Sequence, residues 1–244
     1  MGTEHDVQII SAPTDENPFA VIYKPAGLAS APLQEGGESA LTAAARLYPC
    51  ILQVAGKKQA EHGLVHRIDT DTRGLLLIAS TQESYRRLLA FQKEGRFRKE
   101  YTALCQPVRD CWKLLGGFPM PPEDTESISV CMEKHTISSL FRPYSVRGSQ
   151  VRPVTSLSGK AAVKKSGKKQ YSTEICIDRQ MSAHCFLSEG YRHQIRCHLA
   201  WVGFPIKGDR LYNPRRLPGD DFQFCASALV FPHPLTGKDV EIRI

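Results

Sequence analysis

Strand-like segments outnumber helical ones in this chain, and several of them follow each other with no helix between. The segments that have the length and composition of β-strands are 7–12, 19–24, 74–79, 99–108, 171–177 and 182–187, with one or two more after Phe224. The segments with apolar residues at helical spacing are 39–48, 80–94 and 192–203. Strands joined directly tend to pair as antiparallel neighbours, so this order predicts an α+β fold with a largely antiparallel sheet rather than an array of βαβ units.

The length of 244 residues allows a substantial core, either in one large domain or in two small ones. We expect a single domain over residues 1–244 that is divided into two subdomains. The apolar runs are far shorter than the roughly 20 residues that span a bilayer, and residues 1–18 contain acids but no apolar segment of the kind found in signal peptides. The eight cysteines include no C-x-x-C pair, which favours reduced thiols over a zinc site or a disulfide framework. These features predict a cytoplasmic protein that does not associate with membranes, and we expect a monomer.

The basic residues of the chain are concentrated in one stretch. Of the 32 lysines and arginines, eight lie between Arg142 and Lys169, where there is no acidic residue, and the other 24 are balanced by 25 acidic residues. Residues 116–169 are also rich in Pro, Gly and Ser and show little periodicity, so we expect a basic loop or hairpin insertion there. A solvated flexible loop is one interpretation. A surface for a polyanion is the other, since clustered Lys and Arg release counterions from a phosphate backbone.

A single carboxylate lies just before an apolar strand. In HRIDTDTRGLLLIA, residues 66–79, Asp69 follows Arg67 and lies in a polar turn. Threonine and aspartate side chains at 70–72 can bond their own backbone and hold such a turn. A carboxylate at the edge of an apolar layer is poorly hydrated and needs a cation to stay ionised. Three roles fit: a turn cap, part of a metal or hydrolase site, or a nucleophile that acts on a polyanion. For an isolated aspartate the turn cap is the most frequent.

Two further segments carry candidate functional side chains. In EGYRHQIRCHLA, Arg192 and Arg196 are four residues apart, so a helix there would place both on one face, which is unfavourable by roughly 0.2–0.5 kcal/mol unless an anion binds. They either extend to water or bind a carboxylate and a phosphate, for which the planar guanidinium is suited. Tyr101 in RKEYTALC is either a core residue with its hydroxyl at the rim or, between basic neighbours, a stacking surface for a base or a proton acceptor.

The sequence contains no pattern typical of a metal or nucleotide cofactor site. His62 and His66 have the spacing of a zinc-binding helix, but Gly63 occupies the position of the accompanying glutamate and the segment is not helical in character. His193 and His198 are five residues apart and would lie on different sides of a helix. A glycine-rich phosphate-binding loop is also missing. We therefore expect neither a metal nor a cofactor.

Five segments, taken in order, resemble the RluA family of pseudouridine synthases. The segments are YKPAGL, HRIDTDTRGLLLIA, KEYTAL, GYRHQIRCHLAWVGFPIKGDRLY and FCASALVFPHPLTG. The likeness extends from Phe19 to the C-terminus and is weakest over 116–169. It implies the α+β pseudouridine-synthase fold, with a bent, mostly antiparallel central sheet, flanking helices and loops, and a catalytic cleft across the sheet. It also implies that the protein isomerises specific uridines of structured RNA, ribosomal or transfer, to pseudouridine without a cofactor.

The resemblance implies a role for each candidate residue. Asp69 is expected to attack a flipped-out uridine and release the base, which turns and reattaches to the ribose through C5. Tyr101 is expected to pack on the target base and assist proton removal, Arg196 to keep Asp69 ionised, and Ile195 to line the pocket. Arg67 is expected to fill the space left by the flipped nucleotide, since a cation that can stack offsets part of the few kcal/mol that flipping costs. The other residues expected to bind RNA are His66, Arg192, Lys164, Lys165, Lys168 and Lys169.

The chain departs from the family pattern at several positions. Arg73 stands where the family usually has serine, and FCA stands where leucine-histidine-alanine is common. GYRHQIR replaces the common G-R-T-H-Q-I-R, so the first arginine is shifted from position 191 to Arg192. We also expect the chain to lack the accessory RNA-binding domain of many relatives. RNA binding would then depend on the catalytic domain itself, with residues 142–169 as the candidate surface.

Two other classes of protein fit part of the pattern. A glycosidase would need two carboxylates roughly 5–9 Å apart with separate roles. Asp71, Glu189 and Asp209 are available as partners for Asp69, although nothing in the sequence marks any of them as a proton donor. A non-catalytic RNA-binding protein could share the fold without the activity, but the three residues with catalytic assignments are all present.

Overall fold

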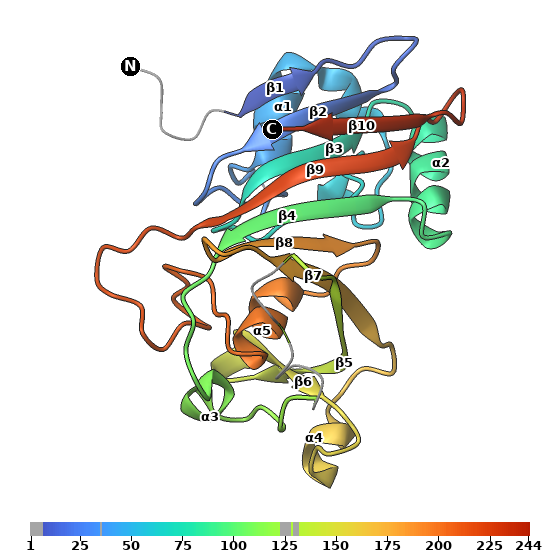
Figure 1. Cartoon of the computed structure of the whole chain (residues 1–244). Helices are drawn as coiled ribbons and strands as arrows, with labels where there is room; N and C mark the ends of the chain where they lie inside the picture. The colour runs from blue at the N-terminus through green and yellow to red at the C-terminus, as the bar shows by residue number, and fades with distance from the viewer. Residues whose placement is uncertain (1–6, 35, 123–127, 129–131) are drawn as a thin grey trace. The chain divides into compact units, whose positions relative to one another are not determined.

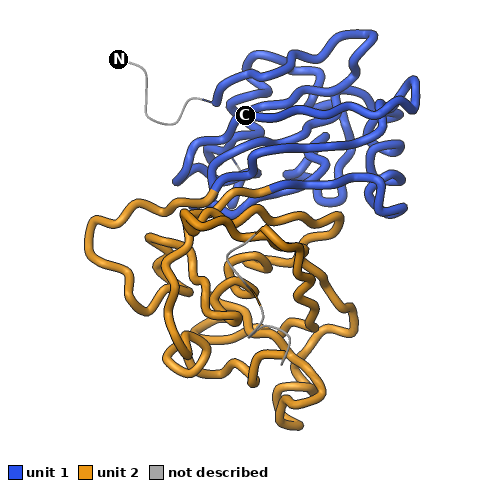
Figure 2. Tube along the Cα trace, in the orientation of Figure 1, with its two compact units in different colours: residues 1–100, 225–244 blue, residues 101–224 orange. Residues whose placement is uncertain are grey.

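The computed structural model describes residues 7–34, 36–122, 128 and 132–244. The chain divides into two compact units, unit 1 with residues 1–100 and 225–244 and unit 2 with residues 101–224 (Figure 2). The predictions about the N-terminal residues, Cys131 and part of 116–169 fall partly on residues outside this description. The cysteines within it are all free. In the part of the chain that the structure describes, no helix has the length and apolar character needed to cross a membrane.

The strands of unit 1 form a mixed sheet in the order β1-β2-β3-β9, with β10 paired to β9 (Figure 1). Their bounds are β1 (Gln8–Ser11), β2 (Phe19–Lys24), β3 (Arg73–Ala79), β9 (Phe224–Pro232) and β10 (Asp239–Arg243). β2 runs antiparallel to both β1 and β3. β9 is parallel to β3 where Arg73 and Gly74 face Cys225 and Ala226, and antiparallel to β10 farther along.

Gly74 permits this parallel pairing. Its φ of 125° lies in a region that L side chains rarely adopt, and a Cβ at this position would lie 2.3 Å from the carbonyl oxygen of Ala226. A glycine is therefore required both by the backbone conformation and by the close approach of β9. The remaining residues of β3, from Leu75 to Ala79, are buried, as their continuous apolar run predicts.

Helices complete unit 1. They are α1 (Ala40–Leu47), α2 (Gln82–Lys93) and the short 3-10 helices η1 (Pro49–Gln53) and η2 (Gln59–Glu61). Ser39 caps α1 and Thr81 caps α2, and each side chain accepts a hydrogen bond from the backbone three residues along. Tyr85 and Leu88 of α2 belong to one apolar cluster with residues of β2, β3 and β9. This cluster is a core of unit 1, and it includes residues of β3, the strand that follows Asp69.

Unit 2 contains a mostly antiparallel sheet. β4 (Arg98–Leu104) begins in unit 1 and ends in unit 2, and the strand order continues β4-β8-β7-β5-β6. The other bounds are β5 (His135–Tyr144), β6 (Gln150–Val154), β7 (Tyr171–Ile177), β8 (Ser182–Leu187), α3 (Cys111–Leu115), η4 (Val146–Gly148), α4 (Lys160–Lys164) and α5 (Gln194–Trp201). β5 pairs with β7 over its first half and with β6 over its second half. The segment 116–169 therefore contains a hairpin, β5-β6, followed by the short basic helix α4.

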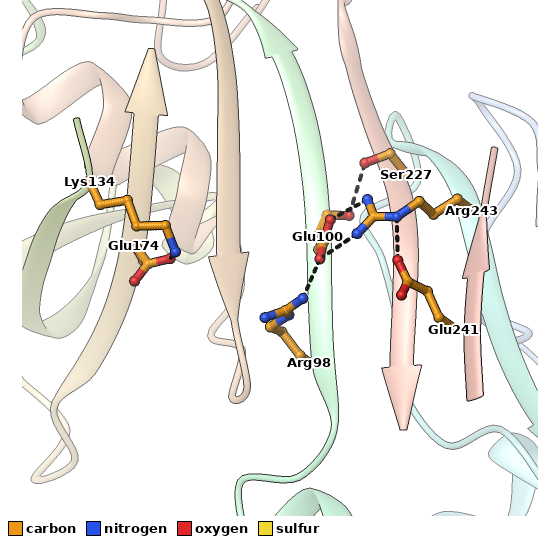
Figure 3. A network of polar contacts seen from close by, with 7 residues as sticks. All are labelled: Arg98, Glu100, Lys134, Glu174, Ser227, Glu241 and Arg243. Carbon is orange, nitrogen blue, oxygen red and sulfur yellow. Dashed lines mark hydrogen bonds and ion pairs between the residues drawn. The ribbon is translucent and has the colours of Figure 1, made fainter. Parts of the chain in front are cut away.

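Charged side chains link strands within each unit (Figure 3). In unit 1 the buried carboxylate of Glu100 accepts hydrogen bonds from Arg98 at 2.8 Å and from Arg243 at 2.5 and 3.0 Å. The Ser227 hydroxyl donates to the Glu100 carbonyl oxygen at 3.4 Å, so the start of β4 is tied to β9 and β10. In unit 2 Lys134 donates to Glu174 of β7 at 2.8 Å.

Candidate active site

Asp69 lies in a turn of unit 1 that leads into β3. The carbonyl oxygen of Asp69 accepts a hydrogen bond from the backbone of Thr72 at 3.0 Å, and that of Thr70 accepts one from Gly27 at 2.9 Å. Lys24 Nζ donates to the same Thr70 oxygen at 2.9 Å. The carbonyl oxygens of this turn are therefore bound by backbone groups and by Lys24. The Oγ1 of Thr72 is buried and has no hydrogen-bond partner among the described residues.

Lys24 is fully buried at the end of β2, which is unusual for a lysine. Besides Thr70, its ammonium group donates to the carbonyl oxygens of Pro25 at 2.9 Å and Leu28 at 2.7 Å. Burial lowers the pKa of Lys24 to about 8, while the nearby charges of Asp69 and Asp71 act in the opposite direction. Lys24 therefore fixes the loop after β2 to the turn of Asp69 and places a cation near its carboxylate. The YKPAGL motif contains this residue, but the sequence alone assigned it no role.

The burial of Lys24 predicts a pH-dependent contribution to stability, measurable against a Lys24→Met variant. The folded-state pKa is about 8 and the ordinary value is 10.5. Between these values the unfolded chain binds more protons than the folded chain. The free energy of unfolding of the native protein should therefore rise, relative to the variant, as the pH increases through this window, by up to about 3 kcal/mol. Urea unfolding below and within the window measures this difference. A difference that stays constant or falls as the pH rises contradicts the assignment.

His66 and Arg67 precede Asp69 in opposite environments. His66 is buried, its Nε2 accepts the backbone hydrogen bond of Leu77 at 3.2 Å, and its ring packs against Phe97. Burial and the neighbouring positive charge of Lys99 lower the pKa of His66 to about 3, so the ring is neutral at physiological pH. Arg67 is exposed and forms an ion pair with a glutamate at 3.0 Å. His66 thus holds the motif against β3, and its predicted contact with the substrate stays a prediction.

Tyr101 lies on β4, in unit 2, and is largely buried. Its ring stacks on that of Phe224, with centroids 5.3 Å apart and an interplanar angle of 17°. Lys99, two residues earlier on β4, is also buried. The stacked pair shows that Tyr101 packs against an aromatic ring, which is one of the two interpretations its sequence context leaves open. Its predicted contact with the target base is not tested by this packing.

The helix α5 presents Ile195 and Arg196, and both are buried. It begins at Gln194, because His193 adopts a left-handed conformation with φ 56°. The prediction of a helix from residue 192 is therefore wrong, and Arg192 does not share a helix face with Arg196. Arg192 is exposed instead and donates to the carbonyl oxygens of Gly148 and Gln150 in the β5-β6 turn.

The guanidinium of Arg196 forms a buried bidentate ion pair with Asp209. Nε lies 2.8 Å from Oδ2 and Nη2 lies 2.8 Å from Oδ1, and the two side chains are 3% and 0% exposed. Oδ1 of Asp209 also accepts from the backbone of Leu211 at 2.8 Å and of Tyr212 at 3.1 Å. From the sequence, Asp209 is a candidate only for the second carboxylate of a glycosidase. The GDRLY segment after the helix was the available signal for its role.

A second buried network fixes α5 on the sheet of unit 2. His198 Nε2 lies 3.0 Å from the Ser139 hydroxyl on β5, and its Nδ1 lies 2.8 Å from the Thr173 hydroxyl on β7. Gln194 donates to the same Thr173 hydroxyl at 2.9 Å. Burial lowers the pKa of His198 to about 3, so this contact stays uncharged at physiological pH. The position of Arg196 on α5 is thus set by polar contacts at both ends of the helix.

The basic stretch divides into exposed and buried members. Lys164, Lys165 and Lys168 are exposed, and Lys169 is exposed and pairs with Glu189 at 2.6 Å. Arg152 on β6 is buried instead: it donates to carbonyl oxygens at 115 and 116 and lies against aromatic rings. Arg152 therefore belongs to the core of unit 2, and the exposed lysines of the stretch lie in and after α4. Within the described ranges no group of three or more His, Cys, Asp or Glu side chains could hold a metal ion.

Residues 18–201, which contain Asp69, Tyr101 and Arg196, match the sequence model of the family described as RNA pseudouridylate synthase. The chain belongs to this family. It is 27% identical to the ribosomal large subunit pseudouridine synthase D of Zymomonas mobilis over 237 residues, 93% of this chain and 66% of that relative. It is also 28% identical to the dual-specificity RNA pseudouridine synthase RluA of Salmonella typhimurium, over 92% of this chain and 87% of that relative. Against several curated members of the family, the chain spans between about half and two thirds of their length.

The fold of this family member is also that of solved pseudouridylate synthases. The structure of human RNA pseudouridylate synthase domain containing 1 matches with a TM-score of 0.66 and 18% identity, over 100% of this chain and 85% of that one. Human RNA pseudouridylate synthase domain containing 4 matches with a TM-score of 0.60. At this level of identity the likeness concerns the fold. The predicted α+β pseudouridine-synthase fold with a mostly antiparallel sheet is confirmed.

Proposed function

We propose that this protein isomerises uridines in RNA to pseudouridine, with Asp69 as the catalytic carboxylate. The observation that carries the proposal is the turn of Asp69, which lies within the residues that match the family and is pinned by the buried ammonium group of Lys24. A carboxylate on a fixed turn with a cation nearby is suited to attack an electrophilic carbon, since it stays ionised and does not have to be ordered during the reaction.

The reaction would proceed by detachment and reattachment of the base. The Asp69 carboxylate attacks the flipped-out nucleotide, at the sugar or at the base, and the bond between N1 and C1′ breaks. The base then turns, a bond forms between C5 and C1′, and the bond between Asp69 and the nucleotide breaks. The proton on C5 is lost while N1 gains one, so the carboxylate is regenerated. No atom enters or leaves the RNA, so the reaction requires no redox partner, metal or energy donor.

The other predicted residues take supporting roles in this proposal. Tyr101 packs on the target base and assists removal of the C5 proton, Arg196 keeps the Asp69 carboxylate ionised, and Ile195 lines the pocket across the sheet. Arg67 occupies the position vacated by the flipped nucleotide. The half-exposed side chain of Arg67, which pairs with Glu61, supports this role because it can be reached by RNA. The exposed lysines at 164–169 bind the RNA backbone. Arg192, in the segment that contains Arg196, and His66, in the segment that contains Asp69, also contact the RNA.

We also propose that residues 1–244 act as a single catalytic domain, with 116–169 as its basic insertion, and that the protein works as a cytoplasmic monomer without a nucleotide cofactor. Ribosomal or transfer RNA is the proposed partner, on the basis of the names of the relatives and the excess of basic residues. The hydrolase alternative is less well supported. Asp209, one of the carboxylates considered as a second acid, is fully buried in its ion pair with Arg196.

An assay on unmodified transcripts of ribosomal or transfer RNA tests the proposed function. Ribosomal or transfer RNA transcribed without modifications should acquire pseudouridine, detected by carbodiimide labelling, while the mass of the RNA stays unchanged and no free uracil appears. Free uracil would instead identify a hydrolase that acts on the glycosidic bond. Binding of the RNA without formation of pseudouridine or free uracil would indicate a non-catalytic RNA-binding protein.

A further inference from the structure

Two tyrosines of unit 2 lie side by side next to α5. Tyr171 begins β7 and Tyr191 precedes the helix, and their ring centroids are 5.2 Å apart. Both rings rest on Phe141 of β5, which is buried and lies parallel to Tyr191 at 5.0 Å. Tyr171 lies 6.1 Å from the same Phe141 ring. The two tyrosines are themselves partly exposed, so a buried aromatic ring holds a pair of rings at the surface.

A lysine lies against one ring of this aromatic pair, and a second lysine precedes it in the chain. Lys169 Nζ lies 5.7 Å from the centroid of the Tyr171 ring, within cation–π range. The backbone of Gly167 donates to the carbonyl oxygen of Phe141 at 3.0 Å, which attaches the basic segment to the strand that supports the tyrosines. Lys168 is exposed in the same segment. Glu189 is the acidic residue beside the pair, and its carboxylate is engaged by Lys169 at 2.6 Å.

The combination of aromatic rings and exposed lysines indicates the chemistry of the ligand. Rings at a surface bind the faces of unstacked bases, while lysines bind the phosphates between them. Bases in a duplex are already stacked and cannot use such rings. We therefore propose that Tyr171 and Tyr191, flanked by Lys168 and Lys169, form a stacking surface for an unpaired nucleotide of the RNA substrate. This proposal rests on the proposed function and adds to it that RNA loops, rather than duplexes, are bound.

Tyr191 occupies one of the positions at which this chain departs from the family pattern given above. The common family pattern G-R-T-H-Q-I-R has arginine at this position, and here the arginine is shifted to Arg192, which bonds the β5-β6 turn. A ring thus replaces a cation directly before α5. Positive charge is supplied instead by Lys168 and Lys169, on the neighbouring segment.

Binding of a fluorescent stem–loop RNA to the full chain tests the proposal. The probe carries 2-aminopurine beside a loop uridine, and its fully paired duplex serves as the comparison RNA. Stacking on the tyrosines should quench the fluorophore in the stem–loop but not in the duplex. Tyr191→Leu and Tyr171→Leu should each weaken stem–loop binding by about tenfold and reduce the quenching, since one stacked base contributes an affinity of this order. Tyr191→Phe and Tyr171→Phe keep the rings and should bind as the native protein does.

A matched pair of lysine variants tests the charged part of the surface. Lys169 pairs with Glu189 and lies over Tyr171. Lys134 likewise pairs with Glu174 at 2.8 Å (Figure 3). Its Nζ lies 5.4 Å from the centroid of an aromatic ring. Lys169→Gln should lower the slope of log affinity against log salt concentration by about 1, because one phosphate contact is lost. Lys134→Gln should leave the slope unchanged. Equal slopes for both variants would overturn the assignment of Lys169.

The outcomes separate this proposal from the proposed function. If pseudouridine forms but the leucine variants bind the stem–loop as tightly as the native protein, the stacking surface is refuted and the isomerase stands. If the leucine variants bind weakly while no protein forms pseudouridine, the surface stands and the isomerase is refuted. Thermal melting of each variant checks folding. Should the leucine variants not fold, the native protein still decides, since absence of quenching in the stem–loop overturns the proposal.

Discussion

Asp69→Asn is expected to abolish the conversion of uridine to pseudouridine while RNA binding stays nearly unchanged. The amide has the shape of the carboxylate but is a poor nucleophile, so the rate should fall by about 10³-fold or more. Binding should persist because phosphate contacts, to which a carboxylate contributes little, supply most of the affinity. The turn should also persist, since the bonds to its carbonyl oxygens come from the backbone of Gly27 and Thr72 and from Lys24 and are kept in the variant. Carbodiimide labelling under single-turnover conditions measures the rate, and filter binding measures the affinity.

Asp71→Asn is the matched control for this experiment. Asp71 lies in the same turn, is exposed, and like Asp69 raises the pKa of Lys24. Loss of its charge therefore acts on the pKa of Lys24 in the same direction without removing the proposed nucleophile. Its rate should stay within a few-fold of the native rate. Comparable losses of activity in the two variants would mean that charge near Lys24, and not the carboxylate of Asp69, supports the reaction.

β3, the strand that follows Asp69, is predicted from the sequence because its apolar character is continuous. The run from Leu75 to Ala79 is apolar throughout and is buried throughout. β5 was not predicted, because its buried side alternates Ile137, Ser139 and Phe141. Ser139 is polar but buried, and it contacts His198 of α5 at 3.0 Å. Strands are predicted from the alternation of apolar and polar residues, and this buried serine interrupts it. Its hydroxyl faces the core because it contacts a histidine 59 residues away.

The candidate site shows the same division between local and distant causes. The position of Asp69 before a buried strand is a local property, and the sequence predicts it. The burial of Lys24 is not a local property and is not predicted. Lysines are usually exposed, and the Thr70 oxygen that Lys24 binds lies 46 residues away. The helix boundary at Gln194 depends on the left-handed backbone of His193, which is a residue type that helices also accept. Sequence spacing alone therefore placed Arg192 on the helix.

Asp209→Asn is expected to lower the free energy of unfolding by about 3–5 kcal/mol. The change removes the negative charge of Asp209 from its buried ion pair with Arg196, and the loss of one partner from such a pair has an effect of this size. Asparagine can still accept the backbone hydrogen bonds of Leu211 and Tyr212, so the turn itself is retained. Arg196 should then reorient, and the rate of pseudouridine formation should fall as well. Urea unfolding with an unchanged m-value measures the first effect, and the labelling assay measures the second.

Asp178→Asn separates the ion pair from the turn. One oxygen of Asp178 accepts backbone hydrogen bonds from Gln180 at 2.8 Å and from Ser182 at 2.9 Å, which resembles the turn at Asp209, but the side chain lies nearer the surface. This variant should lose less than about 1 kcal/mol, because the neutral amide keeps the bonds to the backbone and solvent screens the lost charge. Similar losses in the two variants would show that the turn, and not the charge facing Arg196, determines the stability of this region. A large loss at Asp209 alone shows that the protein depends on the buried pair to hold the arginine that is proposed to act on Asp69.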